Sequence, residues 1–171
     1  MTDTPPYRIR SATARDAPKI AAIYAPYVRD TVITFEFEAP SADEFAARMA
    51  TGDGRYPWLV AEGASGILGY AYASVFRARP AYRNTAESTV YIDQSARHRG
   101  IGRALMEALL AELRHRAFHR VIAGVTLPSD ASVRLHERLG FTKVGVFREV
   151  GRKFDQWHDV GFWELPLAGT V

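Results

Sequence analysis

The chain has 171 residues, of which 47% are hydrophobic and 24% are charged, and its formal net charge is +3. This balance is typical of an ordinary soluble globule, so we expect one folded domain over residues 1–171. The chain contains no cysteine, which excludes disulfides and thiolate metal sites and fits a reducing compartment. The first residues lack the apolar run of a signal peptide, and no window of about 18 apolar residues follows, so the sequence predicts a cytoplasmic protein without a membrane span.

The modest positive charge is compatible with a nucleic acid, a membrane surface or a polyphosphate ligand. Basic residues cluster in two places, Arg97–Arg103 and Arg114–Arg120. Neither cluster is interleaved with the aromatic side chains that single-strand binders use, and the second fits the solvated end of a helix, where the dipole favours cations. We therefore expect no nucleic-acid partner and no membrane partner.

The first half of the chain predicts a strand, two helices and three further strands. Residues 7–13 alternate as a strand does, and Thr13–Asp16 offers a capping-box start to a helix. Ser41–Glu44 caps a second short helix that runs to about Ala50 and ends at Gly52. Strands are then predicted over residues 56–62, 66–76 and 85–92, with the first two joined as a hairpin.

The second half predicts two helices that alternate with three strands. Leu105, Leu109 and Leu113 lie four residues apart within residues 102–117, which indicates a helix with one buried stripe. Residues 120–127 read as a strand, residues 130–140 as a helix ended by Gly140, and residues 141–150 and 157–167 as closing strands. The order β-α-α-β-β-β-α-β-α-β-β predicts a single mixed sheet covered by helices on both faces.

The stretch VYIDQSARHRGIGRAL, residues 90–105, joins a strand to a helix through two glycines. A helix entered through glycine presents unpaired backbone N–H groups, and the helix dipole there favours a closely packed phosphate. Only Gly100 and Gly102 occur, so the dinucleotide fingerprint G-x-G-x-x-G is missing, and the P-loop motif is missing as well. The junction predicts an anionic ligand, although an ordinary tight turn would have the same residues.

The pattern Arg97-x-x-Gly100-x-Gly102, followed later by a strand, a helix and the tripeptide LGF, resembles the GNAT superfamily of acetyl-CoA-dependent N-acetyltransferases. The segments RYPWLVAE, RARPAYRNTAESTVYI, LPSDASVRLHERLGF and QWHDVGFWEL look like the branch that acetylates phosphinothricin, methionine sulfone and methionine sulfoximine. This resemblance implies an α/β GNAT fold with a central, mostly antiparallel twisted sheet and helices on both faces. It also implies acetyl-CoA as co-substrate, no metal, and a homodimer.

The resemblance assigns acetyl-CoA to the glycine junction, where the turn would hold the pyrophosphate and the preceding strand would pair with the pantetheine arm. Asp130 stands where the wider superfamily has an asparagine that bonds the pantetheine amide. Aspartate accepts but does not donate such a bond, and capping of a helix is an equal alternative for it. The other implied cofactor-binding residues are Val90, Tyr91, Ile92, Arg97, His98, Arg99, Gly100, Ile101, Gly102 and Arg103.

Acetyl transfer to an amine needs a base for the amine, donors for the oxyanion and help for the departing thiolate. Glu87 shares one face of its predicted strand with Thr89 and Tyr91, and the resemblance makes Glu87 the base. By the same resemblance, His136 occupies the position that protonates the departing thiolate. From the residues alone, Glu87 could be a surface glutamate and His136 a packed bystander. Backbone N–H groups near Val90 would meet the oxyanion.

A small amino-acid analogue with a phosphinate, sulfone or sulfoximine group needs cations and hydrogen-bond donors on one side of its site. The resemblance implies that the loop FRARPAYRN supplies them, although a solvated loop would also explain its arginines. The aromatic residues near the C-terminus could belong to the core or to the site. With Glu87, the implied acceptor-binding residues are Phe35, Arg77, Arg79, Tyr82, Ser88, Thr89 and Lys153.

The residues and the resemblance together predict an enzyme that acetylates a small amino-acid analogue. The acceptor amine would attack acetyl-CoA directly, because a chain without cysteine forms no acyl-cysteine intermediate. Acetylation of an ordinary amino acid, a polyamine or a protein N-terminus is the alternative within the superfamily. The arginine-bearing loop disfavours a cationic acceptor. A non-catalytic acyl-CoA-binding module and a nucleic-acid module are the alternatives outside enzymes, and the presence of both Glu87 and His136 disfavours the first.

Overall fold

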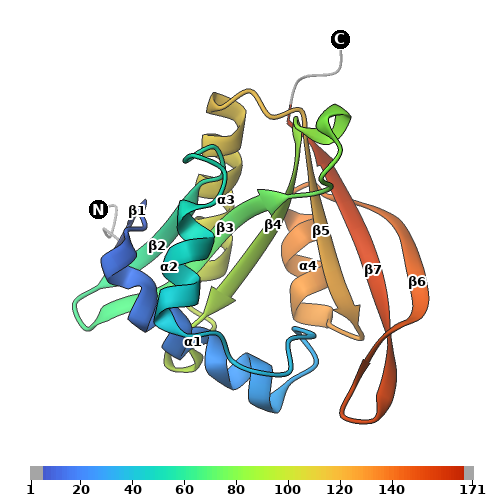
Figure 1. Ribbon diagram of the computed structural model, residues 1–171, viewed down its shortest axis with the longest axis horizontal. Helices are drawn as coiled ribbons and strands as arrows, with labels where there is room; N and C mark the ends of the chain where they lie inside the picture. The colour runs from blue at the N-terminus through green and yellow to red at the C-terminus, as the bar shows by residue number, and fades with distance from the viewer. Residues whose placement is uncertain (1–5, 168–171) are drawn as a thin grey trace.

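A computed structural model describes residues 6–167 of the chain (Figure 1). Its strands form one seven-stranded sheet in the order β1-β2-β3-β4-β5-β7-β6. The predicted order of elements and the mixed sheet are confirmed. The elements are β1 (Tyr7–Ser11), α1 (Ala17–Asp30), α2 (Ala42–Ala50), β2 (Trp58–Gly63), β3 (Gly66–Val75), β4 (Thr85–Ile92), α3 (Ile101–His115), β5 (Arg120–Leu127), α4 (Asp130–Arg138), β6 (Thr142–Lys153) and β7 (Gln156–Pro166).

Both predicted capping boxes are present. At Ser41, the backbone N–H donates to Glu44 Oε2 at 2.6 Å, and the Glu44 N–H donates to Ser41 Oγ at 3.2 Å. At Thr13, the backbone N–H donates to Asp16 Oδ2 at 2.8 Å. The second box caps a short 3₁₀ turn over Ala14–Asp16, so α1 itself begins only at Ala17.

Asp16 is 7% exposed and accepts hydrogen bonds from Arg10 at 2.8 and 2.9 Å, which hold its pKa below the usual 3.8. We expect Asp16→Ala to lower the free energy of unfolding by about 2–3 kcal/mol, because the variant leaves Arg10 and the Thr13 N–H without this acceptor. Urea unfolding at neutral pH measures the loss. A lowered carboxyl pKa stabilises the fold above its unfolded value and ceases to do so as the pH falls, so variant and parent should converge in acid.

Helices cover both faces of the sheet (Figure 1), with α1 and α2 on one face and α3 and α4 on the other. The core under α3 contains Leu105, Leu109 and Leu113, each 0% exposed, which confirms the predicted stripe. None of the helices within residues 6–167 combines the length and the apolar character needed to cross a bilayer. Half of the buried residues in the core under α1 and α2 are aromatic, namely Tyr24, Tyr27, Phe45, Trp58, Tyr70 and Tyr91.

β4 and β5 are parallel neighbours that diverge soon after they meet. They pair only from Thr85 to Glu87 on β4, whereas β3 pairs with β4 as far as Ile92. The next N–H, that of Asp93, donates to a carbonyl on the β3 side at 2.8 Å. Because backbone groups alternate in direction along a strand, the N–H of Val90 points away from β3, toward the side left open by β5.

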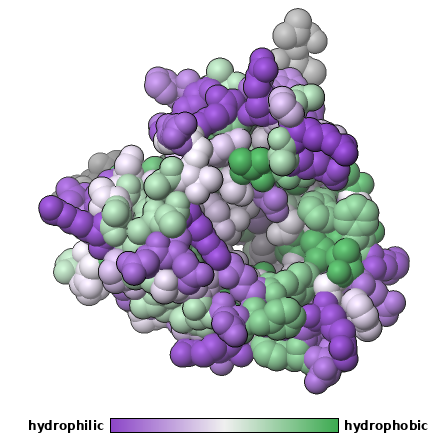
Figure 2. All heavy atoms as spheres, viewed as in Figure 1, coloured by the Kyte–Doolittle hydropathy of each residue, from purple (hydrophilic) through white to green (hydrophobic). Residues whose placement is uncertain are grey.

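β6 and β7 form a long hairpin at one edge of the sheet, and β6 is the edge strand. Both strands confirm the prediction, but β6 continues three residues beyond residue 150, to Lys153. Trp163 on β7 is 1% exposed and belongs to the core, whereas Trp157 is 59% exposed. Apolar side chains are visible at the surface over this side of the molecule (Figure 2).

Candidate active site

Glu87 is the last residue of β4 that pairs with β5, and its side chain is half-buried. On the β5 side it meets glycine and an aromatic ring: a Cβ built on Gly124 would lie 3.6 Å from Glu87 Oε1 and 3.4 Å from the ring of Phe162. Within residues 6–167, no hydrogen bond or ion pair engages the Glu87 carboxylate. Burial raises its pKa above the usual 4.5. A carboxylate in this state is suited to accept a proton.

The face of β4 that carries Glu87 also carries Thr89 and Tyr91, as strand alternation predicted. The Tyr91 ring packs against the rings of Tyr24 and Tyr27, with centroids 4.8 and 4.9 Å apart, so this face looks toward α1. Tyr72 of β3 is the register partner of Thr89, and it lies close enough to Glu87 for the carboxylate charge to raise its pKa. Burial raises the pKa of Tyr72, so its phenol is protonated near neutral pH.

Tyr72 was not among the residues expected at the site. The signal for it was present, because Tyr70 and Tyr72 alternate within the predicted strand over residues 66–76 and so share one face. What the sequence does not give is the pairing partner. Only the register of β3 on β4 brings Tyr72 opposite Thr89 and next to the candidate base.

His136 of α4 is 5% exposed, and its ring meets the edge of Phe141 with centroids 5.2 Å apart. Its Nδ1 lies 2.8 Å from the carbonyl oxygen of Ser132. A carbonyl only accepts, so we assign the proton of the neutral ring to Nδ1, which leaves the lone pair on Nε2. Burial lowers the pKa of His136 below 6.5, so the ring is neutral at neutral pH. It can therefore donate from Nε2 only after it has accepted a proton there.

The N-terminus of α3 is preceded by Gly100, which has a φ of +74° and no atom within 4 Å of a built Cβ. The first intrahelical bond runs from the Ala104 N–H to the Gly100 carbonyl at 3.1 Å, so the three N–H groups before it have no helical carbonyl to bond. Gly102 lies against the end of β4, since its built Cβ would be 3.6 Å from Ile92 Cγ1. The free N–H groups at the start of α3 thus lie next to the end of β4.

The cationic side chains of this junction are exposed. Arg97 places its guanidinium 5.3 Å from the centre of the Tyr27 ring, and Arg103 pairs with Glu107 at 2.8 Å. Arg99 and His98 are exposed as well. The junction therefore combines a strand with unpaired backbone groups, a helix N-terminus and several cations. This combination fits a ligand with a polar chain and a diphosphate, such as acetyl-CoA. The described residues contain no group of three or more His, Asp or Glu side chains that could hold a metal ion.

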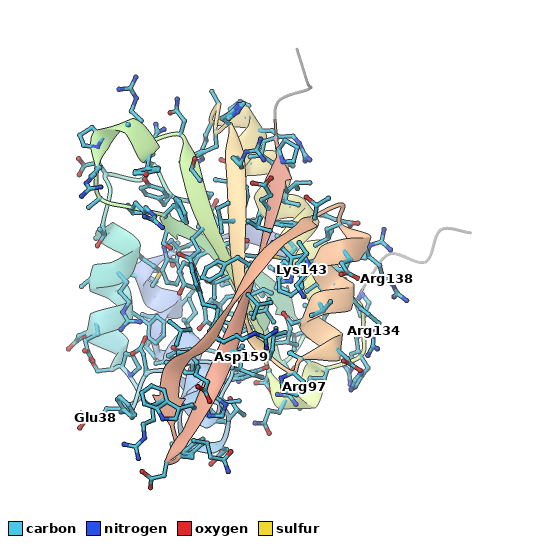
Figure 3. All side chains as sticks on the ribbon, turned by 90° about the vertical axis from the view of Figure 1, so that its right-hand side faces the viewer. Glu38, Arg97, Arg134, Arg138, Lys143 and Asp159 are labelled. Atoms are coloured by element: carbon cyan, nitrogen blue, oxygen red, sulfur yellow. The ribbon has the colours of Figure 1, made fainter. Side chains whose placement is uncertain are left out.

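Asp130 is the first residue of α4, and its side chain is 84% exposed, with the guanidinium of Arg134 3.7 Å from its carboxylate. Ser129 is the N-cap, and its side chain makes no capping bond. The alternative in which Asp130 caps the helix is therefore wrong, although its charge suits the first turn. Arg134 and Arg138 lie on the outer side of the same helix (Figure 3). A contact of Asp130 with coenzyme A stays a prediction.

The connection between β3 and β4 holds the arginines expected to meet the acceptor. Arg77 lies over the rings of Phe76 and Tyr82, at 5.2 and 5.7 Å from their centres. Arg79 is exposed and precedes a short 3₁₀ turn over Pro80–Tyr82. Within residues 6–167, no carboxylate pairs with Arg77 or Arg79. Both cations therefore stand near the start of β4, the same end that carries Glu87.

Two residues expected to bind the acceptor face elsewhere. Ser88 is 6% exposed, and its Oγ donates to the Ile122 carbonyl at 3.4 Å on the face opposite Glu87, because neighbouring residues of a strand alternate. Lys153 is 2% exposed, and its Nζ donates to the carbonyl oxygens of Val28 at 2.7 Å and Thr34 at 2.8 Å. These placements correct the expectation that the side chains of Ser88 and Lys153 contact the acceptor directly.

The chain matches the family model described as an acetyltransferase (GNAT) domain over residues 9–161. It is 41% identical to the phosphinothricin N-acetyltransferase of Streptomyces viridochromogenes over 165 residues, which cover 94% of this chain and 90% of that protein. It is 38% identical to the L-methionine sulfoximine/L-methionine sulfone acetyltransferase of Pseudomonas paraeruginosa, with 95% of each chain covered.

Among solved structures, the chain resembles a GNAT superfamily phosphinothricin acetyltransferase from Sinorhizobium meliloti in complex with acetyl-CoA. The TM-score is 0.90 at 37% sequence identity, and the match covers 94% of this chain and 88% of the other. These similarities extend over the sheet, both helical layers and the glycine junction. They are whole-chain similarities, consistent with the fold expected from the sequence.

Proposed function

Because this chain belongs to the GNAT acetyltransferase family and is an acetyl-CoA-dependent N-acetyltransferase, we propose that it acetylates a small amino-acid analogue of the phosphinothricin, methionine sulfone or methionine sulfoximine type. The observation that carries the proposal is the state of Glu87. Its half-buried, unpaired carboxylate has a raised pKa and stands where β4 and β5 diverge. An α-amine has a pKa near 8 and needs such a base at neutral pH.

We propose that acetyl-CoA binds along the open edge of β4, from Val90 to Ile92, and against the N-terminus of α3. Gly100 allows the chain to enter the helix with its first N–H groups free for the pyrophosphate. The surrounding cations, Arg97 and Arg99 among them, add favourable charge. Tyr91 contributes through its backbone, because its ring is buried against α1.

In the proposed reaction, Glu87 takes one proton from the acceptor's ammonium group. The freed nitrogen bonds to the acetyl carbonyl carbon, and the C–S bond breaks as the thiolate leaves. The N–H of Val90, directed to the open side of β4, donates to the oxyanion and is worth about 3–4 kcal/mol if it behaves like other such donors. The second nitrogen proton passes to His136 Nε2 and from there to the thiolate, so the ring ends neutral as it began.

The acceptor would lie over the face of β4 that carries Glu87 and Thr89. Arg77, free of any carboxylate among the described residues, suits the acceptor's carboxylate, and Arg79 adds positive charge beside it. The hydroxyl of Tyr72 lies on the same face. Phe35, in the connection between α1 and α2, would close the site from that side.

A thiol-release screen tests the acceptor class. Purified enzyme with acetyl-CoA should give the highest kcat/KM with phosphinothricin, methionine sulfone or methionine sulfoximine, since each combines an α-amine with a carboxylate and a second polar group. Ordinary amino acids, a polyamine and a peptide with a free N-terminus serve as comparisons. Faster release with the polyamine or the peptide than with all three analogues would overturn the proposal.

We propose further that the enzyme works in the cytoplasm as a homodimer. Apolar side chains gather on the β6–β7 hairpin and the neighbouring connection between α1 and α2, and an exposed apolar patch of this kind is typical of protein interfaces (Figure 2). The face belongs to an edge strand, which is prone to association. Its members are Ile33, Phe37, Val144, Phe147, Val150, Phe154 and Trp157, from 48% to 77% exposed.

Light scattering after gel filtration tests the dimer. The parent chain should have twice the monomer mass, and Val150→Glu should shift it toward the monomer because the glutamate would be desolvated in the interface. Val75→Glu is the matched control, since Val75 is 46% exposed but lies outside this face. A monomeric parent would refute the homodimer.

A further inference from the structure

A buried lysine ties the end of the β6–β7 hairpin to the connection between α1 and α2. Lys153 is the last residue of β6, and its Nζ donates to the carbonyl oxygens of Val28 and Thr34. Val28 belongs to the last turns of α1, and Thr34 lies beyond the helix. One ammonium group therefore fixes two points of the chain that a flexible connection would otherwise allow to move apart.

A second contact lies beside the first. A Cβ built on Gly151 would overlap the ring of Phe35, so this ring lies directly on the glycine backbone. The ring of His158, the partner of Gly151 on β7, also lies near Phe35, with centroids 6.1 Å apart, and His158 Nε2 is 3.1 Å from the Lys153 carbonyl. The hairpin thus holds both the backbone and an aromatic side chain of the connection.

The connection is in turn bonded to the helices that face β4. The Tyr24 hydroxyl lies 2.5 Å from Thr34 Oγ1 and donates to Glu36 Oε1 at 3.1 Å, and Arg48 of α2 bonds both Glu36 carboxylate oxygens. The Tyr24 ring packs on Tyr91, which shares its face of β4 with Glu87. A chain of contacts therefore leads from Lys153 to the face where the acceptor is proposed to lie.

The chemistry of Lys153 favours a role in positioning over one in stability. Burying an ammonium is costly, and an apolar side chain of equal length would fill the same space without that cost. Within residues 6–167, no carboxylate forms an ion pair with Lys153, and burial lowers its pKa. What an apolar side chain cannot do is hold two carbonyl oxygens at a fixed separation.

We propose that Lys153 is a positioning residue for the acceptor. Through its bonds to Val28 and Thr34 it sets the place of the connection between α1 and α2, and so of Phe35, over the face of β4 that carries Glu87. The inference rests on the proposed function, because that function places the acceptor on this face. Lys153 itself touches neither substrate.

Steady-state kinetics of Lys153→Met test this role, since methionine keeps the length of the side chain and removes its donors. We expect the acceptor KM to rise about 10-fold to 100-fold, as small misplacements of a positioning group do, with the acetyl-CoA KM within about twofold of the parent. Lys143→Met is the matched control. Lys143 lies on the same strand toward the end away from the turn (Figure 3), 5.6 Å from the Trp163 ring, and its variant should match the parent in both KM values.

Gly151→Ala provides an independent variant in case Lys153→Met folds poorly, because its Cβ must displace the Phe35 ring. It should raise the acceptor KM and leave the acetyl-CoA KM unchanged. Unaltered acceptor KM in both folded variants would overturn the proposal, and so would equal rises in both KM values, which would indicate general loosening.

Hydrogen exchange separates failure of this inference from failure of the proposed function. Amides of residues 31–40 should exchange faster in Lys153→Met than in the parent or in Lys143→Met, and this comparison needs no acceptor. Suppose that these amides exchange faster in Lys153→Met but the parent enzyme acetylates none of the analogues. The role of Lys153 in holding the connection would then stand, and only the proposed acceptor class would be refuted. Unchanged exchange would refute the contact.

Discussion

Glu87→Gln should lower kcat/KM at neutral pH by about 100-fold to 10,000-fold, the range typical of a positioned general base. Glutamine keeps the size of the side chain but does not accept the amine proton. The dissociation constant of acetyl-CoA, measured by calorimetry, should stay within about twofold, because Glu87 lies on the acceptor face and not at the glycine junction. Glu164→Gln is the matched control, since Glu164 pairs with Arg120 at 2.8 Å on β5 and β7 and has no role in the chemistry.

The pH dependence of kcat/KM in the parent is a second test of Glu87 as the base. Burial raises the pKa of Glu87 above 4.5, so kcat/KM should fall on the acid side at a pH higher than an ordinary glutamate would give. In Glu87→Gln, the fall of kcat/KM that the protonation of Glu87 causes at low pH should be absent. If the variant turns over at the parental rate across the profile, another group is the base.

Stability should move in the opposite direction to activity. A carboxyl whose folded pKa is raised binds its proton more tightly in the folded chain, so its ionisation costs stability as the pH rises past 4.5. Glu87→Gln removes that cost, and its melting temperature at neutral pH should equal or exceed that of the parent. A large loss of stability would indicate that Glu87 supports the fold, which its lack of partners among the described residues contradicts.

The fold could be predicted from the sequence because its signals are local. The capping box at Ser41, the leucine stripe of α3 and the glycine hairpin between β2 and β3 each depend on residues a few positions apart. The face of Glu87 followed from strand alternation alone. The capping box of Thr13 and Asp16 predicted a helix that begins directly after Thr13. In the structure this box caps a 3₁₀ turn, and α1 begins only at Ala17.

The site was harder to predict because its geometry depends on distant partners. Lys153 was expected at the acceptor, but its ammonium bonds carbonyls more than 100 residues earlier in the chain. Ser88 adjoins Glu87 in sequence and faces the opposite core. Tyr72 joins the site through the register of β3 on β4. Periodicity gives the face of a residue but not what lies across from it.

Glu87 and His136, the two residues proposed to move protons, have pKa values shifted in opposite directions by the same cause. Burial disfavours charge, so it raises the pKa of Glu87 and lowers that of His136. Neither shift is opposed by an ion pair among the described residues. Burial thus leaves the imidazole neutral and makes the carboxylate a stronger base, so both can accept protons in a reaction in which the attacking nitrogen loses two.

His136→Phe should lower kcat by about 100-fold, the low end of the range for a group that moves a proton, while both KM values change little. Phenylalanine keeps a planar ring against Phe141 and removes Nε2. His115→Phe is the matched control, because His115 lies in the last turn of α3, away from the site. Rapid-quench measurement of acetyl transfer distinguishes a slower chemical step from slower product release.

The pH dependence of stability shows whether the variant removed the group as intended. The folded pKa of His136 lies below 6.5, so in the parent the unfolded chain binds its proton first, and stability is lost as the pH falls below that value. The Phe variant lacks this loss, and its stability relative to the parent should improve in acid. If that change occurs while kcat stays at the parental value, His136 is a packed residue, and the thiolate takes its proton from another source.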